Sequence, residues 1–408
     1  MASDDARARK LVLAAMAAGL LLRLLFGFTY WTGKPLTHDE REYLALAESL
    51  RAGRGFSYLP SDSDAPQFGR APGYPAFLAA IGATAPEPAS LARVKLAQAL
   101  AGALLVWIVA ALARRAAGPA AAATGAWITA VYPPLVAVAA YVFSETLYAV
   151  LALGTALALQ SAAARTARPD HTAGAAGLGA GAMAGLAVLV RPSMLFFLPC
   201  ALGWLIATRR YTLAIAFLAG TIAVVAPWTA RNYRAYGRFV LVASEGGVTF
   251  WTGNHPLARG EGDLAANPEI KREEVAFRHA HPGLSPEELE PLYYRAAFGY
   301  IRAHPGAWVA LLGRKLVLLF VPVGPSYALH STRYRLASTA PYLVLLPFAA
   351  AGLRRVWRAR ERPSALLLLF ASAVAVCVVF FPQERFRIPV IDPAMIVCAA
   401  GLRGRSTP

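Results

Sequence analysis

The chain has 408 residues, of which 57% are hydrophobic and 15% charged, and its mean hydropathy is +0.47. This composition excludes an ordinary set of soluble domains and predicts a polytopic membrane protein. The net charge of +17 would suit nucleic acid, but the arginines cluster at the ends of apolar runs, which is the positive-inside pattern, so no nucleic-acid partner is expected. The clusters are Arg114/Arg115, Arg165/Arg168, Arg209/Arg210, the group from Arg354 to Arg362, and Arg403/Arg405.

Repeated apolar runs of about 20 residues predict an all-α bundle, because a helix satisfies its own backbone in lipid. The first run follows a basic start and is too long for a typical signal peptide, so it is expected to be a retained span. A helix at 306–323 carries Arg314 and Lys315 in its middle and is interpreted as interfacial or re-entrant. Ten spans are predicted, at 11–30, 93–113, 119–139, 143–163, 174–190, 193–208, 211–228, 338–353, 364–381 and 388–403.

With a cytoplasmic amino terminus, the arginine clusters fall on the cytoplasmic side and two long segments, 31–90 and 229–337, lie together outside. These segments hold most of the acidic residues. The whole chain, 1–408, is expected to be one membrane domain, and the second segment to form a small extracytoplasmic cap. Alanine-rich runs at 96–126 and 173–187 predict closely packed helix faces, and Arg23 is expected to face the bundle interior.

The first outer segment is expected to begin with a short amphipathic helix. Thr37 and Glu40 form a capping-box pattern, and Gly53 is a plausible stop. The apolar residues at helical spacing are Tyr43, Leu46, Ala47 and Leu50. Their stripe is expected to lie on the membrane surface. A polar, turn-rich stretch at 61–64 and the sequence Pro72-Gly73-Tyr74-Pro75 follow.

Asp39 and Glu40 stand side by side directly after the first span, where a simple anchor needs no acidic pair. Neighbouring residues on a helix point about 100° apart, so one carboxylate is expected to be central and the other supporting. Two structural alternatives stay open. Asp39 would suit the first turn of a helix through the helix dipole, and Glu40 would suit the capping partner of Thr37.

Further candidates lie at the predicted outer ends of spans. Glu145 stands where the third and fourth spans meet, although Ser144 could instead cap a helix with Glu145 in its first turn. Arg191 lies at the outer end of the fifth span, where either an anionic partner or snorkelling would explain it.

Glu384, Arg385 and Arg387 precede the last span. Arginine forks suit phosphate oxygens, and a phosphate at a membrane surface is the head group of a lipid carrier. Anchoring of the helix end in water is the alternative. Arg70 and Arg231 are weaker candidates of the same type.

The sequence contains no Walker loop, no dinucleotide fingerprint and no Cys/His metal spacing. A divalent metal stays open as a cofactor, with Asp39, Glu145 and His38 as the residues that could cluster around it.

An ordered set of motifs resembles bacterial membrane glycosyltransferases of the GT-C class, most closely the protein O-mannosyltransferase and aminoarabinose transferase-like family 39. The motifs are Asp39-Glu40, Arg70-Ala-Pro-Gly-Tyr-Pro75, Ser144-Glu145-Thr146, Arg191-Pro192, Arg231-Asn-Tyr233 with Gly247 and Gly253-Asn254, and Glu384-Arg-Phe-Arg-Ile-Pro389. Together they extend over nearly the whole chain.

The resemblance implies an inverting transfer of a sugar from a polyprenyl phosphate, on the extracytoplasmic side of the bacterial plasma membrane, to a periplasmic or cell-surface acceptor. It implies that Asp39 is the general base, with Glu40 as the second catalytic candidate. Arg385 and Arg387, joined by Arg191, would stabilise the phosphate that leaves. The other substrate-binding residues that it implies are Arg70, Tyr74, Glu145, Arg231, Asn254 and Glu384.

Two rival classes are weighed against a transferase. A transporter or flippase of lipid-linked sugars would call for charged or broken helices at the membrane midplane and an internal repeat, and neither is clear in the sequence. A scaffold protein would have no reason to gather acids and arginines on one face. The sugar, the acceptor and the oligomeric state are left open by the sequence.

Overall fold

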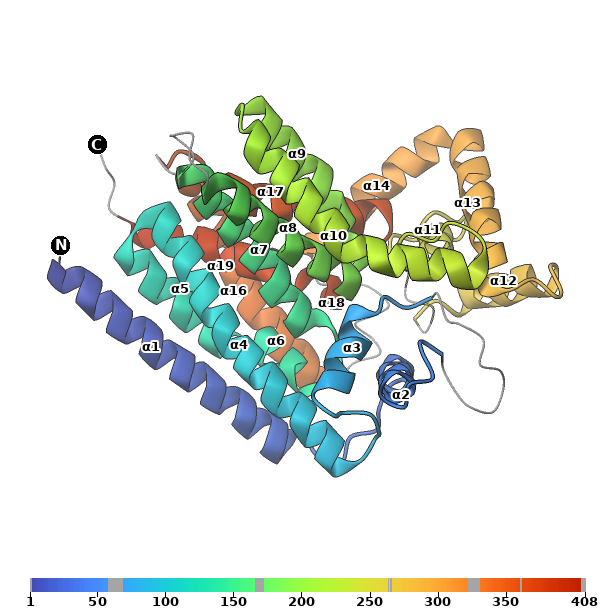
Figure 1. The fold of residues 1–408 in the computed structure, drawn as a ribbon, viewed down its shortest axis with the longest axis horizontal. Coiled ribbons are helices and arrows are strands. Elements are labelled where there is room, and N and C mark those ends of the chain that lie inside the picture. Colours follow the sequence, from blue (N-terminus) through green and yellow to red (C-terminus); the bar gives the residue numbers. More distant parts are fainter. Residues whose placement is uncertain are drawn as a thin grey trace.

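The computed structural model describes residues 2–57, 69–165, 172–262, 264, 266–321, 331–359 and 362–404. Regular structure in these ranges is entirely helical, as the composition predicts. Both termini lie at one end of the molecule, and α2, α3 and α11 to α13 lie toward the other (Figure 1). The predicted turn at 61–64, and Arg168, Arg360 and Arg405 of the predicted clusters, fall outside the described residues.

Within the described ranges, six helices are long and apolar enough to cross a membrane. They are α1 (Ala2–Leu25, continued by η1, Phe26–Tyr30), α4 (Pro88–Ala117), α7 (Glu145–Arg165), α8 (Thr172–Val190), α10 (Tyr211–Tyr236) and α16 (Thr332–Trp357). A seventh span would be a pair bent by 59°, formed by α5 (Pro119–Val131) with α6 (Pro133–Ala137) and η2 (Val138–Ala140). Pro133 and Pro134 account for the bend, because proline interrupts the helical hydrogen bonds.

The three other predicted spans correspond to shorter helices. They are η3 with α9 (Pro192–Phe196 and Phe197–Ala207), α17 (Ser364–Val379), and α19 with η4 (Ile391–Ala400 and Gly401–Arg403). A straight helix needs about 20 residues to cross the hydrocarbon layer, so length alone does not make these helices spans. The number of ten therefore stays a prediction.

Small residues allow close contact inside the bundle, as the alanine-rich runs predict. α8 packs along α10, and a Cβ added at Gly181 would come within 2.0 Å of the Phe217 carbonyl oxygen. Arg23 on α1 is buried, and its guanidinium donates to the carbonyls of Gly19 and Ala130 at 2.9 and 3.2 Å. The prediction that Arg23 faces the protein interior is confirmed.

A smaller core lies outside the main bundle, at the end that carries α11 (Gly246–Gly253), α12 (Pro268–His279) and α13 (Pro286–Ala303) (Figure 1). It is built on Phe250, Trp251, Ile270, Leu289, Tyr293 and Ala297. Ser285 caps α13 in a capping box with Glu288. The chain then continues into α14 (Pro305–Phe320). α14 is not among the six candidate spans, and whether it crosses a membrane stays a prediction.

Three short helices complete the end that carries the candidate site: α2 (His38–Arg51), α3 (Gly73–Ala80) and α18 (Glu384–Arg387). Thr37 caps α2 as predicted, and Gly53, with φ of 72°, follows its end. The expectation that the apolar stripe of α2 lies on the membrane surface is wrong. Tyr43 and Ala47 are buried in the main core, and α2 packs on α3.

Candidate active site

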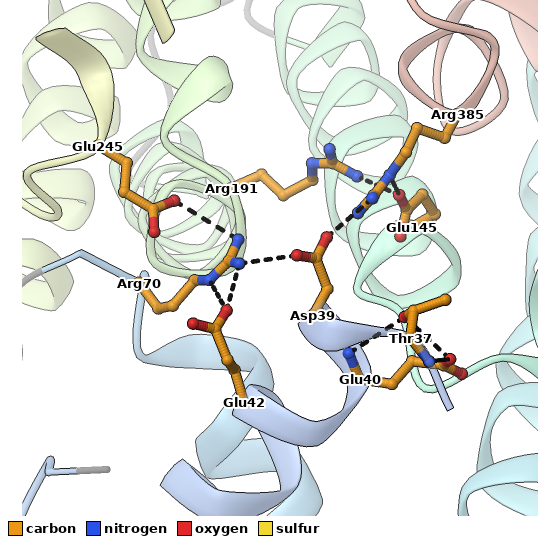
Figure 2. A network of polar contacts seen from close by, with 9 residues as sticks. All are labelled: Thr37, Asp39, Glu40, Glu42, Arg70, Glu145, Arg191, Glu245 and Arg385. Carbon is orange, nitrogen blue, oxygen red and sulfur yellow. Dashed lines mark hydrogen bonds and ion pairs between the residues drawn. The ribbon is translucent and has the colours of Figure 1, made fainter. Parts of the chain in front are cut away.

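Asp39 lies in the first turn of α2, between two arginines that come from distant parts of the chain (Figure 2). Its Oδ1 accepts a hydrogen bond from Nη2 of Arg70 at 2.8 Å, and its Oδ2 accepts one from Nη1 of Arg385 at 2.8 Å. The side chain is 26% exposed. Asp39 is therefore fixed by two charged hydrogen bonds while part of it stays accessible.

Arg70, just before α3, is shared by three carboxylates (Figure 2). Besides Asp39, it donates from Nε to Oε2 of Glu42 at 3.0 Å, and Nη2 contacts the same oxygen. Its Nη1 lies 3.4 Å from Oε2 of Glu245, which precedes α11. Arg70 thus joins α2 to the segment that precedes α11.

Arg385 on α18 links Asp39 to Glu145, the first residue of α7. Its Nε donates to Oε1 of Glu145 at 3.0 Å, and its guanidinium lies over the ring of Phe143, 4.5 Å from the centroid. Arg191, at the end of α8, places Nη1 2.9 Å from the same Oε1. The Glu145 side chain is 0% exposed. The sequence left open whether Glu145 lies in the first turn of a helix or belongs to the site. In the structure it does both, because it begins α7 and pairs with Arg385 and Arg191.

The pKa values of Asp39 and Glu245 are shifted in opposite directions. Burial is the largest influence on Asp39 and would raise its pKa, but Arg385 and Arg70 together hold that pKa below its ordinary value. Desolvation by the surrounding protein raises the pKa of Glu245 to about 7, although 45% of its side chain is exposed; Arg70 opposes this shift, and Glu42 and Asp39 add to it. Asp39 is accordingly charged at neutral pH, whereas Glu245 titrates there.

Glu40 has a structural place beside this network. Its Oε2 accepts from the backbone N–H of Thr37 at 2.8 Å in the capping box, and its Oε1 accepts from the backbone N–H of Val142 at 2.9 Å. The side chain therefore ties the start of α2 to the segment before α7. Both oxygens are engaged in holding backbone, which favours the supporting role over the catalytic one.

Two further candidates, Tyr74 and Arg231, contact aromatic residues near the site. Tyr74 is fully buried and packs edge-to-face on Tyr43, with 4.9 Å between ring centroids. Arg231 lies over the ring of Trp228 and donates to the Phe56 carbonyl at 3.2 Å. Both residues pack the surroundings of α2 and the segment that follows it.

Asn254 connects three helices through its side chain. Its Oδ1 accepts from Nε1 of Trp308 at 2.9 Å and from Nζ of Lys315 at 3.1 Å, and its Nδ2 donates to the Val379 carbonyl at 3.0 Å. It joins the end of α11 to α14 and α17, away from the contacts of Asp39.

Glu384 and Arg387 face a different part of the molecule from Arg385. Both line a small pocket that also includes Glu261 and Gln383. Nε of Arg387 lies 2.8 Å from Oδ1 of Asp392, and its guanidinium lies over the ring of Tyr342. The structure therefore does not place Arg387 beside Arg385 and Arg191, where the resemblance implied it.

Sequence reasoning missed two acidic members of the network, Glu42 and Glu245. Glu42 carried a local signal, since it stands three residues after Asp39 and so shares a face of α2 with it. Glu245 carried none, because only the fold brings it to Arg70.

In the ranges that the structure describes, no three His, Cys, Asp or Glu residues are grouped as a metal ion would require. Arg385 pairs with both Asp39 and Glu145, two of the residues considered as metal ligands. His38, the third, is 84% exposed, and its Nε2 lies 3.3 Å from Glu42.

Known structures share this architecture. The archaeal oligosaccharyltransferase AglB from Archaeoglobus fulgidus, in complex with an inhibitory peptide and a dolichol-phosphate, matches 97% of this chain over 50% of its own, with 16% identity and a TM-score of 0.61. The apo form of the oligosaccharyltransferase from the same organism matches 96% of this chain over 50% of its own, with 16% identity and a TM-score of 0.58. ArnT from Cupriavidus metallidurans bound to undecaprenyl phosphate matches 96% of this chain over 77% of its own, with 13% identity and a TM-score of 0.44.

The fold is thus that of the GT-C class of membrane glycosyltransferases, and it confirms the fold class and the resemblance predicted from the sequence. Within that class, residues 70–230 match the family described as dolichyl-phosphate-mannose-protein mannosyltransferase. The chain spans about half the length of the archaeal oligosaccharyltransferase. No curated protein sequence matches it significantly.

Proposed function

We propose that the protein is an inverting glycosyltransferase that moves one sugar, a hexose or a pentose, from a polyprenyl-phosphate donor to an extracytoplasmic acceptor. The observation that carries the proposal is the position of Asp39, 2.8 Å from both Arg70 and Arg385 in a GT-C fold. The acceptor is a hydroxyl or amine of a protein, lipid or glycan, and the membrane is the plasma membrane of a bacterium, with the site on its outer side.

The reaction requires two bond changes at one carbon and one proton transfer. The acceptor oxygen or nitrogen attacks the anomeric carbon, the bond from that carbon to the phosphate oxygen breaks, and its electron pair leaves with polyprenyl phosphate. Asp39 takes the acceptor proton as the new bond forms, which a positioned carboxylate can do without an unusual pKa.

Arg385 and Arg191 supply the positive charge for the phosphate. Both guanidiniums lie within 3.0 Å of Glu145, so they stand side by side where Figure 2 draws them. Two preorganised arginines offer several donors to phosphate oxygens, and stabilising the charge that develops is often the largest contribution to catalysis. The dolichol-phosphate in the AglB complex is a ligand of the same chemistry in a protein of the same fold.

The test is a transfer assay with purified protein in lipid nanodiscs, polyprenyl-phosphate hexoses and pentoses labelled in the sugar, and a bacterial envelope extract as the acceptor source. Labelled sugar in the acceptor fraction and free polyprenyl phosphate should appear together. Replacement Asp39→Asn should reduce turnover about 10²- to 10⁴-fold, the usual contribution of a general base.

The matched control is Glu48→Gln, which removes an exposed carboxylate from the same helix and should leave turnover unchanged. Near-normal turnover by a folded Asp39→Asn protein would remove Asp39 from the role of base. With the same protein in sealed proteoliposomes, movement of lipid-linked sugar across the bilayer with no release of lipid phosphate would identify a flippase instead.

A further inference from the structure

Arg385 is held by two carboxylates that differ in their surroundings. Its Nε pairs with Glu145 at 3.0 Å and its Nη1 with Asp39 at 2.8 Å. Glu145 is 0% exposed and fixed at the start of α7, whereas Asp39 is 26% exposed. One partner of Arg385 is enclosed by protein, and the other can be reached from outside.

The contact with Asp39 is one that a phosphate could replace. Carboxylate and phosphate oxygens accept the same charged hydrogen bonds from a guanidinium fork. In the proposed reaction, the donor phosphate needs Arg385, and Asp39 already occupies one of its nitrogens. A second anion near this guanidinium must therefore either share it with Asp39 or displace Asp39.

We propose that the donor phosphate and Asp39 compete for Arg385, so that donor binding itself releases the base. This inference rests on the proposed function. In the resting protein, Arg385 is held by both carboxylates. When the donor binds, Glu145 keeps Arg385 in place, the phosphate takes the nitrogen that held Asp39, and Asp39 keeps only its bond to Arg70.

The exchange explains how Asp39 can act as a base although two arginines stabilise its charged form in the resting protein. Two arginines hold the pKa of Asp39 below its ordinary value against the opposing effect of burial, and a carboxylate stabilised in this way is a weak base. Loss of the Arg385 contact returns basicity to Asp39 at the moment when a sugar is present to be attacked. Before the donor arrives, the base is restrained.

The competition has a reciprocal consequence for binding. If phosphate weakens the pair between Asp39 and Arg385, then Asp39 must weaken the binding of phosphate by the same factor. Removing the charge of Asp39 should thus reduce turnover and yet tighten the binding of the lipid phosphate. A residue that simply helped to hold the donor would have the opposite effect on binding.

The experiment measures the dissociation constant of a short-chain polyprenyl phosphate without sugar, using the full chain in nanodiscs. Asp39→Asn should bind it about 5-fold more tightly than the unchanged protein or better, the lower end of typical coupling between sites. Asp39→Ser repeats the test with a smaller side chain. The corresponding polyprenol, which has no phosphate, should bind all three proteins equally.

The matched control is Glu42→Gln, which removes a carboxylate one turn along α2 that pairs with Arg70 and not with Arg385. It should change the affinity less than twofold. Equal or weaker binding by Asp39→Asn and Asp39→Ser would overturn the competition, and so would equal tightening by Glu42→Gln, because a general charge effect would then suffice. If the unchanged protein bound no polyprenyl phosphate, the proposed function would fail as well.

Discussion

Arg385 and Arg387 stand two residues apart on the four-residue helix α18 and serve different regions of the molecule. Two helical steps turn the side chain by about 200°, so the two arginines point to opposite sides. The Arg385 side chain is 30% exposed and contacts Asp39 and Glu145. Arg387 is 2% exposed and contacts Asp392, which in turn accepts a hydrogen bond from Tyr132 at 3.1 Å.

The difference shows how one turn of helix can belong to both a site and a core. A partly exposed ion pair can exchange partners with a ligand, while an enclosed pair cannot do so without leaving a charge uncompensated. Exposure, and not residue type, separates the two arginines. The comparison predicts that replacing Arg387 harms the fold and that replacing Arg385 harms the reaction.

The largest effect is expected from Arg387→Ala, which leaves Asp392 buried without its cation. Breaking a buried pair in this way costs about 3–5 kcal/mol, so thermal melting in detergent should fall sharply. The double replacement Arg387→Met with Asp392→Asn should recover most of the loss, because no lone charge remains. A stable Arg387→Ala protein that has lost turnover would instead assign Arg387 to the site.

Arg385→Gln should affect the reaction and not the fold. Turnover is expected to fall about 10²- to 10³-fold, the typical effect of removing one donor to a developing anion, with little change in melting temperature. Arg385→Lys, which restores a charge but not the fork, should recover part of the activity. Arg41→Gln removes an exposed arginine from α2 and serves as the control. Equal losses of stability and turnover in Arg385→Gln would favour a structural role.

A smaller effect is expected where the backbone presents Asp39 to Arg385. Thr37→Ala removes the cap of α2 and should cost about 0.5–2 kcal/mol of stability. Turnover should fall by less than tenfold, since Asp39 keeps both arginines. The measurement compares melting temperature and transfer rate in one preparation. A loss of turnover as large as that of Asp39→Asn would show that the cap does more than hold the helix.

The smallest effect is expected on the pH dependence of turnover. It tests Arg70, which pairs with Glu245, and not Arg385. The pKa of Glu245 is raised to about 7, so this group ionises between pH 6 and 8 and then draws Arg70 away from Asp39. Turnover should rise a few-fold over that interval, and Glu245→Gln should flatten the profile. Asp39, whose pKa is lowered, stays charged throughout. A profile that keeps its inflection in Glu245→Gln would assign it to another group.

Stability should show the opposite trend with pH. A raised folded-state pKa means that the native protein binds the proton more strongly than the unfolded chain, so stability falls as pH rises from about 4.5 to 7. Glu245→Gln should remove this part of the pH dependence. The melting temperature measured across the same buffers tests the sign.

Local features were the most predictable from the sequence. The capping box at Thr37 was predicted because its pattern spans only four residues. The interior position of Arg23 followed from the cost of a charge facing lipid. The all-α membrane bundle was predicted from composition, because few folds can accommodate so many apolar runs.

The sequence could not predict relations that depend on how helices are rotated. Periodicity found the apolar stripe of α2 but could not tell whether lipid or α3 would cover it. The two arginines of α18 had the same expected role in the sequence, and only the fold showed that they point in different directions. Glu245 joined Arg70 only through tertiary structure, so no spacing in the sequence could have indicated the pair.

The two residues that meet at Asp39 and Arg385 are separated by 346 positions in the chain. A membrane protein is synthesised and inserted from its amino terminus, so Asp39 reaches its side of the bilayer long before Arg385 exists. Until α18 arrives, the incomplete chain carries a carboxylate and no partner from the last segment. Synthesis of α18 is thus the event that completes the pair between Asp39 and Arg385, and under the proposed function a chain arrested before Arg385 lacks one of the two arginines expected to hold the donor phosphate.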